Sequence, residues 1–254
     1  MKPEITHMSY STALTFELVT QFDFLTLGAP TFPSLRKEAI YKTEAGATGV
    51  ILFLQYKLGD HITGTNSSLR NLWGTPYYRF LIHPRSKLKR HNLLANLEHM
   101  NTLVYYTAPE FHTMGGLYDS LINKTVLANT TFWPPSGVSM LTEKENNTVS
   151  YKRNAQYGIL EPGNIKIKRL TKGDMILHII REKFASNRAD ICDDNTFVQL
   201  GDKMLENYLG VFQSAKEKRL VNDIKLSRER IDSRDYLSMI SSLLYDCYVY
   251  IVTE

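Results

Sequence analysis

The first half of the chain alternates short apolar runs of strand length with polar turns. The longest run, GVILFLQYKL at 49–58, follows a glycine-flanked turn and has the length of a strand rather than of a buried helix. Similar runs occupy 76–82 and 102–108, and the segment 38–45 alternates polar and apolar positions weakly. We predict that 38–45 and 50–58 form a β-hairpin and that two further strands follow it.

Apolar positions at helical spacing mark other segments, and they dominate the last third of the chain. In the first half they predict helices over 11–24, 88–100 and 114–126. Beyond residue 170 the strand signal fades, and helices are predicted over 174–184, 203–218 and 234–252. Between the two parts, 150–157 and 165–170 have the pattern of edge strands.

The resulting order of elements is a helix, three strands, a helix and a strand, followed by a mixed segment and then helices. This order predicts an α/β (or α+β) protein with a mixed central β-sheet flanked by helices. We place a boundary after residue 170, so that an α/β domain covers 1–170 and a helical C-terminal region covers 171–254.

Composition and charge narrow the function classes only a little. Hydrophobic residues make up 43% of the chain, which is enough for a sizeable core. Cys192 and Cys247 lack the CxxC spacing and are too few for a disulfide framework. No apolar run reaches membrane-spanning length and no basic-then-apolar leader occurs, so we expect a cytoplasmic protein without a membrane partner. The net charge of +4 permits a nucleic-acid partner but does not demand one.

The candidate chemistry lies at the polar end of the longest strand. Successive side chains of a strand alternate between faces, so Gln55 and Lys57 emerge from one face, roughly 7 Å apart. In a hairpin whose turn is centred on 47–48, Glu38 lies opposite Lys57 on that face. The preceding helix can bring Glu17 to the same place. The pattern therefore gathers carboxylates, an amide and an ammonium around one point.

That combination suits metal-assisted hydrolysis of phosphodiesters. Mg²⁺ prefers oxygen ligands and keeps several waters, so one or two carboxylates can suffice. The metal lowers the pKa of a bound water, and a lysine orients that water or neutralises charge that develops in the transition state. We predict that Glu17, Glu38 and Gln55 bind Mg²⁺ or Mn²⁺ and that Lys57 positions the attacking water.

These features resemble the PD-(D/E)xK nuclease superfamily. The glutamine in the QxK triplet, Gln55-Tyr56-Lys57, is similar to the Mrr-like restriction endonuclease branch of that superfamily. The resemblance covers residues 11–112 and rests on the αβββαβ order, the glutamate of the first helix and the QxK triplet. It implies a restriction-endonuclease-like core and Mg²⁺-dependent endonuclease cleavage of DNA, in restriction or anti-phage (antiviral) defence.

One position departs from the pattern of that superfamily. The superfamily places an acidic metal ligand on the strand before QxK, and in the predicted hairpin this place belongs to Lys42, whose charge would repel a metal. Glu38 can substitute if it reaches across to Lys57, and Glu44 can do so if a bulge shifts the register. The second hypothesis is therefore a catalytically inactive nuclease-fold subunit that binds nucleic acid or a protein partner.

The densest basic run of the chain opens the predicted helix over 88–100. Its cations are Arg85, Lys87, Lys89 and Arg90. Backbone amides and the dipole at the start of a helix favour phosphate, so we predict that this run contacts DNA, or RNA. The alternative is a solvated charge run that only improves solubility.

The other candidates also have structural interpretations. Gln55 and Lys57 can mark a strand end that reaches solvent, and Glu17 can lie on a solvated helix flank. A pair between Glu38 and Lys57 on the surface would add little stability. The apolar helix over 234–252 can pack on its own domain or form a surface for a protein partner or a homodimer.

Overall fold

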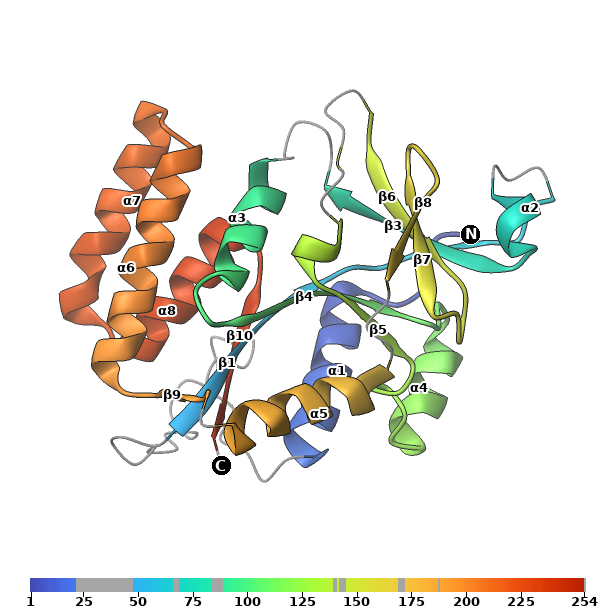
Figure 1. Cartoon of the computed structure of the whole chain (residues 1–254), viewed down its shortest axis with the longest axis horizontal. Coiled ribbons are helices and arrows are strands. Elements are labelled where there is room, and N and C mark those ends of the chain that lie inside the picture. The colour runs from blue at the N-terminus through green and yellow to red at the C-terminus, as the bar shows by residue number, and fades with distance from the viewer. Residues whose placement is uncertain are drawn as a thin grey trace. The chain divides into compact units, whose positions relative to one another are not determined.

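The computed structural model describes residues 1–21, 48–65, 69–83, 89–138, 141, 145–168, 172–186 and 188–253. Within these residues the chain has eight α-helices and two five-stranded sheets, one mixed and one antiparallel (Figure 1). The predicted mixed α/β class is confirmed. Two sheets are present where the sequence predicts a single central sheet.

The elements have the following bounds. The helices are α1 (His7–Gln21), α2 (Arg70–Trp73), α3 (Lys89–Glu98), α4 (Met114–Ile122), α5 (Lys172–Ala185), α6 (Asp194–Val211), α7 (Ala215–Ser227) and α8 (Ser233–Ile240). The strands are β1 (Thr48–Tyr56), β2 (Asp60–Ile62), β3 (Tyr77–His83), β4 (Leu103–Pro109), β5 (Thr130–Trp133), β6 (Asn147–Tyr151), β7 (Tyr157–Glu161), β8 (Ile165–Lys168), β9 (Asp190–Ile191) and β10 (Tyr248–Thr253). The first sheet has the order β10-β1-β4-β5 with β9 also paired to β1, and the second has the order β2-β3-β6-β7-β8.

The chain forms two compact units, and each unit consists of three separate stretches. Unit 1 comprises Met1–Gln21, Tyr56–His91 and Tyr105–Ile179. Unit 2 comprises Phe22–Gln55, Asn92–Val104 and Ile180–Glu254. The predicted division into an α/β domain over 1–170 and a helical region over 171–254 stays a prediction, because compactness does not test whether a part folds alone.

Unit 1 contains the antiparallel sheet. β6, β7 and β8 follow one another along the chain and pair in that order, whereas β3 pairs with β6 although α3, β4, α4 and β5 lie between them in the sequence. Aromatic side chains fill one side of it: Tyr78 stacks on Tyr151 at 5.4 Å between ring centroids. The hydroxyl of the fully buried Tyr151 donates a hydrogen bond to the carbonyl of Pro109 at 2.6 Å.

The predicted edge strand over 150–157 is wrong in its middle part. β6 ends at Tyr151 and β7 begins at Tyr157, so a turn separates two antiparallel strands. Asn154 lies in this turn with φ of 62°, a left-handed conformation that asparagine tolerates better than most residues. The next predicted strand, 165–170, is present as β8 over Ile165–Lys168.

Unit 2 contains β1 and its antiparallel partner β10. The two strands pair from Gly49 with Thr253 to Leu54 with Tyr248, and they run side by side in Figure 1. Every residue of β1 after Thr48 is buried, as expected for a strand that is covered on both faces. The predicted strand over 50–58 is therefore confirmed as a core strand.

The predicted helix over 234–252 is wrong beyond residue 240. α8 ends at Ile240, a π-helical turn covers Ser241–Tyr245, and Asp246 reverses the chain in the left-handed region with φ of 56°. The following segment, YVYIV, consists of aromatic and β-branched residues that favour strands, and β1 supplies a ladder of backbone hydrogen bonds for it. The C-terminal region is thus helical except for β9 and β10.

Two other predicted helices have different bounds. α1 begins at His7 instead of residue 11, because Thr6 and Ser9 exchange side-chain and backbone hydrogen bonds at its start. The predicted helix over 203–218 is two helices, α6 and α7. Ser214 separates them by capping α7, where its hydroxyl accepts a hydrogen bond from the backbone of Glu217.

The segment 38–45, the predicted hairpin partner of β1, lies outside the described residues. The restriction-endonuclease-like αβββαβ core therefore stays a prediction. The strands predicted over 76–82 and 102–108 are confirmed as β3 and β4, and the helices predicted over 88–100 and 114–126 are confirmed as α3 and α4 with shorter bounds.

Candidate functional site

Lys57 is the predicted catalytic residue with the clearest surroundings, and it belongs to unit 1. It directly follows β1, and its backbone N–H donates to the carbonyl of Thr107 at 2.7 Å. Its ammonium donates to the carbonyl of Ile82 at 2.5 Å and lies 5.4 Å from the centre of the Tyr106 ring. The half-buried side chain is therefore fixed at both its backbone and its charged end.

Three aromatic side chains complete a polar cluster around this lysine. Tyr106 is fully buried, and its hydroxyl lies 2.8 Å from Nδ1 of His91. The two rings are nearly parallel, at 9° and 6.0 Å between centroids. His83 meets Tyr106 edge-on at 6.1 Å. We refer to Lys57, His83, His91 and Tyr106 as the Lys57 cluster.

His91 is uncharged in this cluster at neutral pH. Burial, and secondly the positive charge of Lys57, lower the pKa of His91 from 6.5 to about 4. A neutral imidazole can form one hydrogen bond with the Tyr106 hydroxyl without adding a second cation next to the lysine. The charged ammonium of Lys57 therefore meets no repulsion from a charge on His91.

Two of the predicted nucleic-acid-binding cations lie next to the cluster in sequence. Lys89 and Arg90 immediately precede His91 in the first turn of α3, where Lys89 is exposed and Arg90 is half-buried. The N–H groups of a first helical turn have no partners within the helix and favour anions. The other two cations of the predicted run, Arg85 and Lys87, lie outside the described residues.

Glu17 is a buried residue of α1 in unit 1. Its side chain is 4% exposed, and Oε2 accepts a hydrogen bond of 2.6 Å from the backbone N–H of Val126, itself fully buried. The interpretation as a solvated helix flank is therefore wrong. The carboxylate of Glu17 therefore has a structural role. Without it, the buried N–H of Val126 would lack the hydrogen bond that it makes to water in the unfolded chain.

Gln55 belongs to unit 2 and is 1% exposed. Its Nε2 donates to the carbonyls of Tyr245 at 3.3 Å and Asp246 at 3.2 Å, and it lies 3.4 Å from Oδ2 of Asp246. Its Oε1 is buried and has no hydrogen-bond partner among the described residues. Gln55 therefore does not reach solvent, and its amide nitrogen holds the chain reversal that precedes β10.

The Mg²⁺ site predicted at Glu17, Glu38 and Gln55 stays a prediction. The carboxylate of Glu17 accepts the amide of Val126, Gln55 supplies one oxygen, and Glu38 lies outside the described residues. In the described part of the chain, no group of three or more His, Cys, Asp or Glu side chains is placed to hold a metal.

Sequence reasoning missed His91 and Tyr106. It set aside the histidines because their spacing does not form a helical metal-binding pair, and it assigned the tyrosine to the core. One local signal was present: His83 and His91 stand at the two ends of the densest basic run of the chain. Their common approach to Tyr106 brings residues of β3, the first turn of α3 and β4 together within unit 1, and sequence periodicity does not show this.

The described part of the chain contains no helix that is both long enough and apolar enough to cross a membrane. Unit 1 contains the Lys57 cluster and, next to it in the sequence, the cations that start α3. Comparison of the chain with protein-family models, with curated proteins and with solved structures finds no match.

Proposed function

We propose that the protein binds nucleic acid through phosphate contacts at the start of α3, next to the Lys57 cluster. The observation that carries this proposal is the first turn of α3, which buries His91 against Tyr106 while Lys89 stays exposed. The buried contact holds the turn in place, so that its exposed cation and its backbone amides can meet a ligand. DNA is the first candidate and RNA the second.

Phosphate binding fits the charges of this region. Proteins contact the phosphates of nucleic acids through lysine and arginine, other polar side chains, and the N–H groups at helix N-termini. Because His91 is uncharged at neutral pH, the attraction for phosphate comes from the ammonium of Lys57 and from the cations of α3. Binding of this kind is independent of base sequence and weakens as salt displaces it.

The binding test compares two double charge reversals. Lys89→Glu combined with Arg90→Glu should weaken binding of a fluorescein-labelled DNA duplex by about tenfold or more, and should flatten the slope of log affinity against log salt by about one per lost phosphate contact. The matched control is Lys216→Glu combined with Lys218→Glu, which makes the same charge change on exposed residues of α7. Fluorescence anisotropy with DNA and RNA at several salt concentrations gives both quantities.

Two outcomes would contradict this proposal. One is that the wild-type protein binds neither DNA nor RNA at low salt. The other is that both pairs of reversals weaken binding equally, since that result would reflect net charge rather than a site on α3.

A metal-dependent DNA endonuclease, acting in restriction or anti-phage defence, is the second candidate. One observation favours it: Oε1 of Gln55, in the glutamine position of the QxK triplet, is buried and without a hydrogen-bond partner in the described residues. Such an oxygen would gain from a cation or another donor. The described carboxylates do not complete a metal site, so this candidate ranks below nucleic-acid binding alone.

Calorimetric titration with MgCl₂ and MnCl₂, together with nicking of supercoiled plasmid, separates the two candidates. The first proposal predicts no specific heat of metal binding and no metal-dependent nicking. Nicking that requires the metal and disappears in Lys57→Ala would establish the endonuclease instead. Nicking that persists in Lys57→Ala would indicate a contaminating nuclease.

A further inference from the structure

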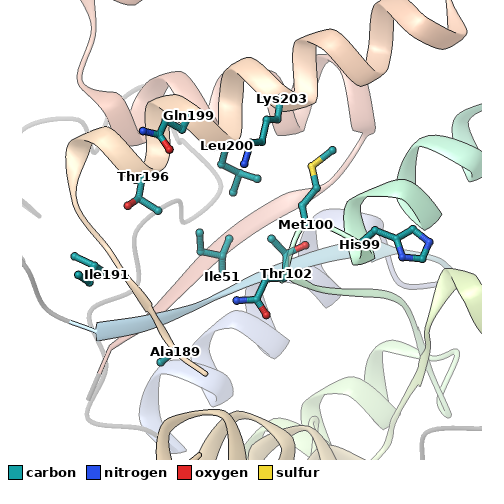
Figure 2. Close-up of a pocket in the computed structure, with 11 residues that line it drawn as sticks. Ile51, His99, Met100, Thr102, Ala189, Ile191, Thr196, Gln199, Leu200 and Lys203 are labelled. Carbon is teal, nitrogen blue, oxygen red and sulfur yellow. The ribbon is translucent and has the colours of Figure 1, made fainter. Parts of the chain in front are cut away.

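A pocket of unit 2 has the size and lining of a small-molecule site. It has a volume of about 850 Å³ and lies beside β1, the end of α3 and α6 (Figure 2). Small-molecule sites in proteins usually measure about 300–1,000 Å³. The pocket shares no residue with the Lys57 cluster or with the cations of α3, so it is a separate feature of the molecule.

The deeper part of the pocket is apolar. Ile51 of β1 is 3% exposed, Leu200 of α6 is 7% exposed, and Met100 follows α3. Figure 2 shows Leu200 reaching from α6 toward Ile51, with Met100 beside them. These three side chains offer a surface for a flexible apolar group, and methionine adapts its shape readily.

The charge at the pocket is positive. Lys203 projects from α6 on the same side as Leu200 (Figure 2). Among the described residues that line the pocket, none carries a carboxylate. The nearby carboxylate of Asp193 caps α6, where it accepts a hydrogen bond from the backbone N–H of Thr196 at 2.7 Å and another from the Thr196 side chain. An anion is therefore favoured over a cation as the ligand.

The wall opposite α6 is held in shape by hydrogen bonds. The ammonium of Lys183 donates to the backbone carbonyl of Asn101 at 3.0 Å and lies 3.1 Å from its Oδ1. Thr102 donates through its hydroxyl to the carbonyl of Leu97 at 2.8 Å. These contacts fix the turn that ends α3, so the pocket exists before a ligand arrives and little ordering opposes binding.

We propose that this pocket binds a small organic anion with an apolar body, of the kind represented by a medium-chain carboxylate. The anionic group lies at Lys203, and the apolar chain covers Ile51, Met100 and Leu200. This function is independent of nucleic-acid binding, because the residues that carry it lie in unit 2 and those at the start of α3 lie in unit 1.

The test compares two probes on the full-length chain. Decanoate and decyltrimethylammonium carry similar apolar chains and opposite charges. Isothermal titration calorimetry should detect saturable binding of decanoate at one site and at least about tenfold weaker binding of decyltrimethylammonium. This comparison needs no variant, so it holds even where a substitution impairs folding.

Variants then locate the site. Lys203→Met keeps most of the length of the side chain and removes its charge, so decanoate affinity should fall by about tenfold, whereas Lys203→Arg should retain it. Lys216→Met is the matched control on an exposed lysine of α7 and should leave affinity unchanged. The proposal is overturned if decanoate does not bind, if both probes bind equally, or if Lys203→Met binds decanoate as well as the wild type.

Measuring DNA affinity and decanoate affinity on the same variants distinguishes a failure of this proposal from a failure of the proposed nucleic-acid binding. Lys203→Met should bind the DNA duplex as the wild type does, and the charge reversals at Lys89 and Arg90 should leave decanoate affinity unchanged. Failure of one experiment then leaves the outcome of the other intact.

Discussion

His91 shows how a single buried group sets a dependence on pH. The unfolded chain protonates this histidine as the pH falls through 6.5, whereas burial and the charge of Lys57 lower its folded-state pKa to about 4 and delay protonation. Stability that is present above 6.5 is therefore lost as the pH falls toward 4. The full difference corresponds to about 3 kcal/mol.

The pH prediction uses His91→Phe, which keeps a ring beside Tyr106 and cannot titrate. Between pH 7 and about pH 5 the wild type should lose about 2 kcal/mol more of its free energy of unfolding than the variant loses. Urea unfolding at both pH values measures this difference. The pKa of His61 is also lowered, but its effect cancels because both proteins carry this histidine. Equal losses in the two proteins would show that His91 is not kept neutral by the fold.

Glu17 permits a test of structural against catalytic use. Glu17→Ala removes the acceptor of the buried Val126 amide and should reduce the free energy of unfolding by about 2 kcal/mol. Glu17→Gln keeps an acceptor oxygen and should cost less. Glu206→Ala, on an exposed glutamate of α6, is the control and should change stability by less than about 0.5 kcal/mol. Catalytic carboxylates are commonly strained, so a gain of stability in Glu17→Ala would favour a catalytic role instead.

At the scale of elements, the packing of α5 in unit 1 depends on one glycine. A Cβ at Gly173 would lie 1.8 Å from Cγ of Leu127, and the Gly173 N–H donates to the carbonyl of Leu127 at 3.2 Å. The first turn of α5 therefore approaches the loop after α4 more closely than any side chain allows.

Gly173→Ala and Gly210→Ala form a matched pair of helical substitutions. Gly173→Ala should destabilise the protein by about 1–3 kcal/mol, because the loop or the helix must move. A Cβ at Gly210 would meet no atom of the described residues within 4 Å, so Gly210→Ala in α6 should be neutral or stabilising by up to about 1 kcal/mol. Thermal or urea unfolding of both variants gives the comparison, and equal effects would contradict the close approach.

At the scale of the whole molecule, the connectivity decides which parts can fold alone. Three stretches of each unit alternate along the chain, and β10 in the last stretch pairs with β1 in an earlier one. A cut after residue 170 would leave both strands without this ladder. The division predicted from the sequence would then separate partners.

The fragment prediction follows from that pairing. Residues 171–254 expressed alone should show helical circular dichroism but no cooperative thermal transition, and addition of 1–170 should restore one. A cooperative transition of 171–254 by itself would instead establish an autonomous helical domain. Hydrogen exchange on residues 50–54 in the reconstituted pair would show whether β1 regains protection.

Much of the element pattern was accessible from the sequence, and the polar contacts were not. The apolar run of β1 and the helical spacing of α3 are local properties, so they were predicted close to their observed bounds. The segment YVYIV was assigned to a helix because it continues an apolar helical pattern. It became β10 because β1, far earlier in the chain, was available to pair with it.

The sequence by itself determined that a buried strand ends near Gln55 and Lys57 and that a helix with basic residues comes later in the chain. Both predictions rest on the spacing of apolar residues that are neighbours in the sequence. Only the tertiary structure decided what those polar groups do. Gln55 holds the reversal at Asp246, 191 residues away, and Glu17 holds the amide of Val126, 109 residues away. A hydrogen bond needs atoms within about 3 Å, and only folding brings such distant residues that close.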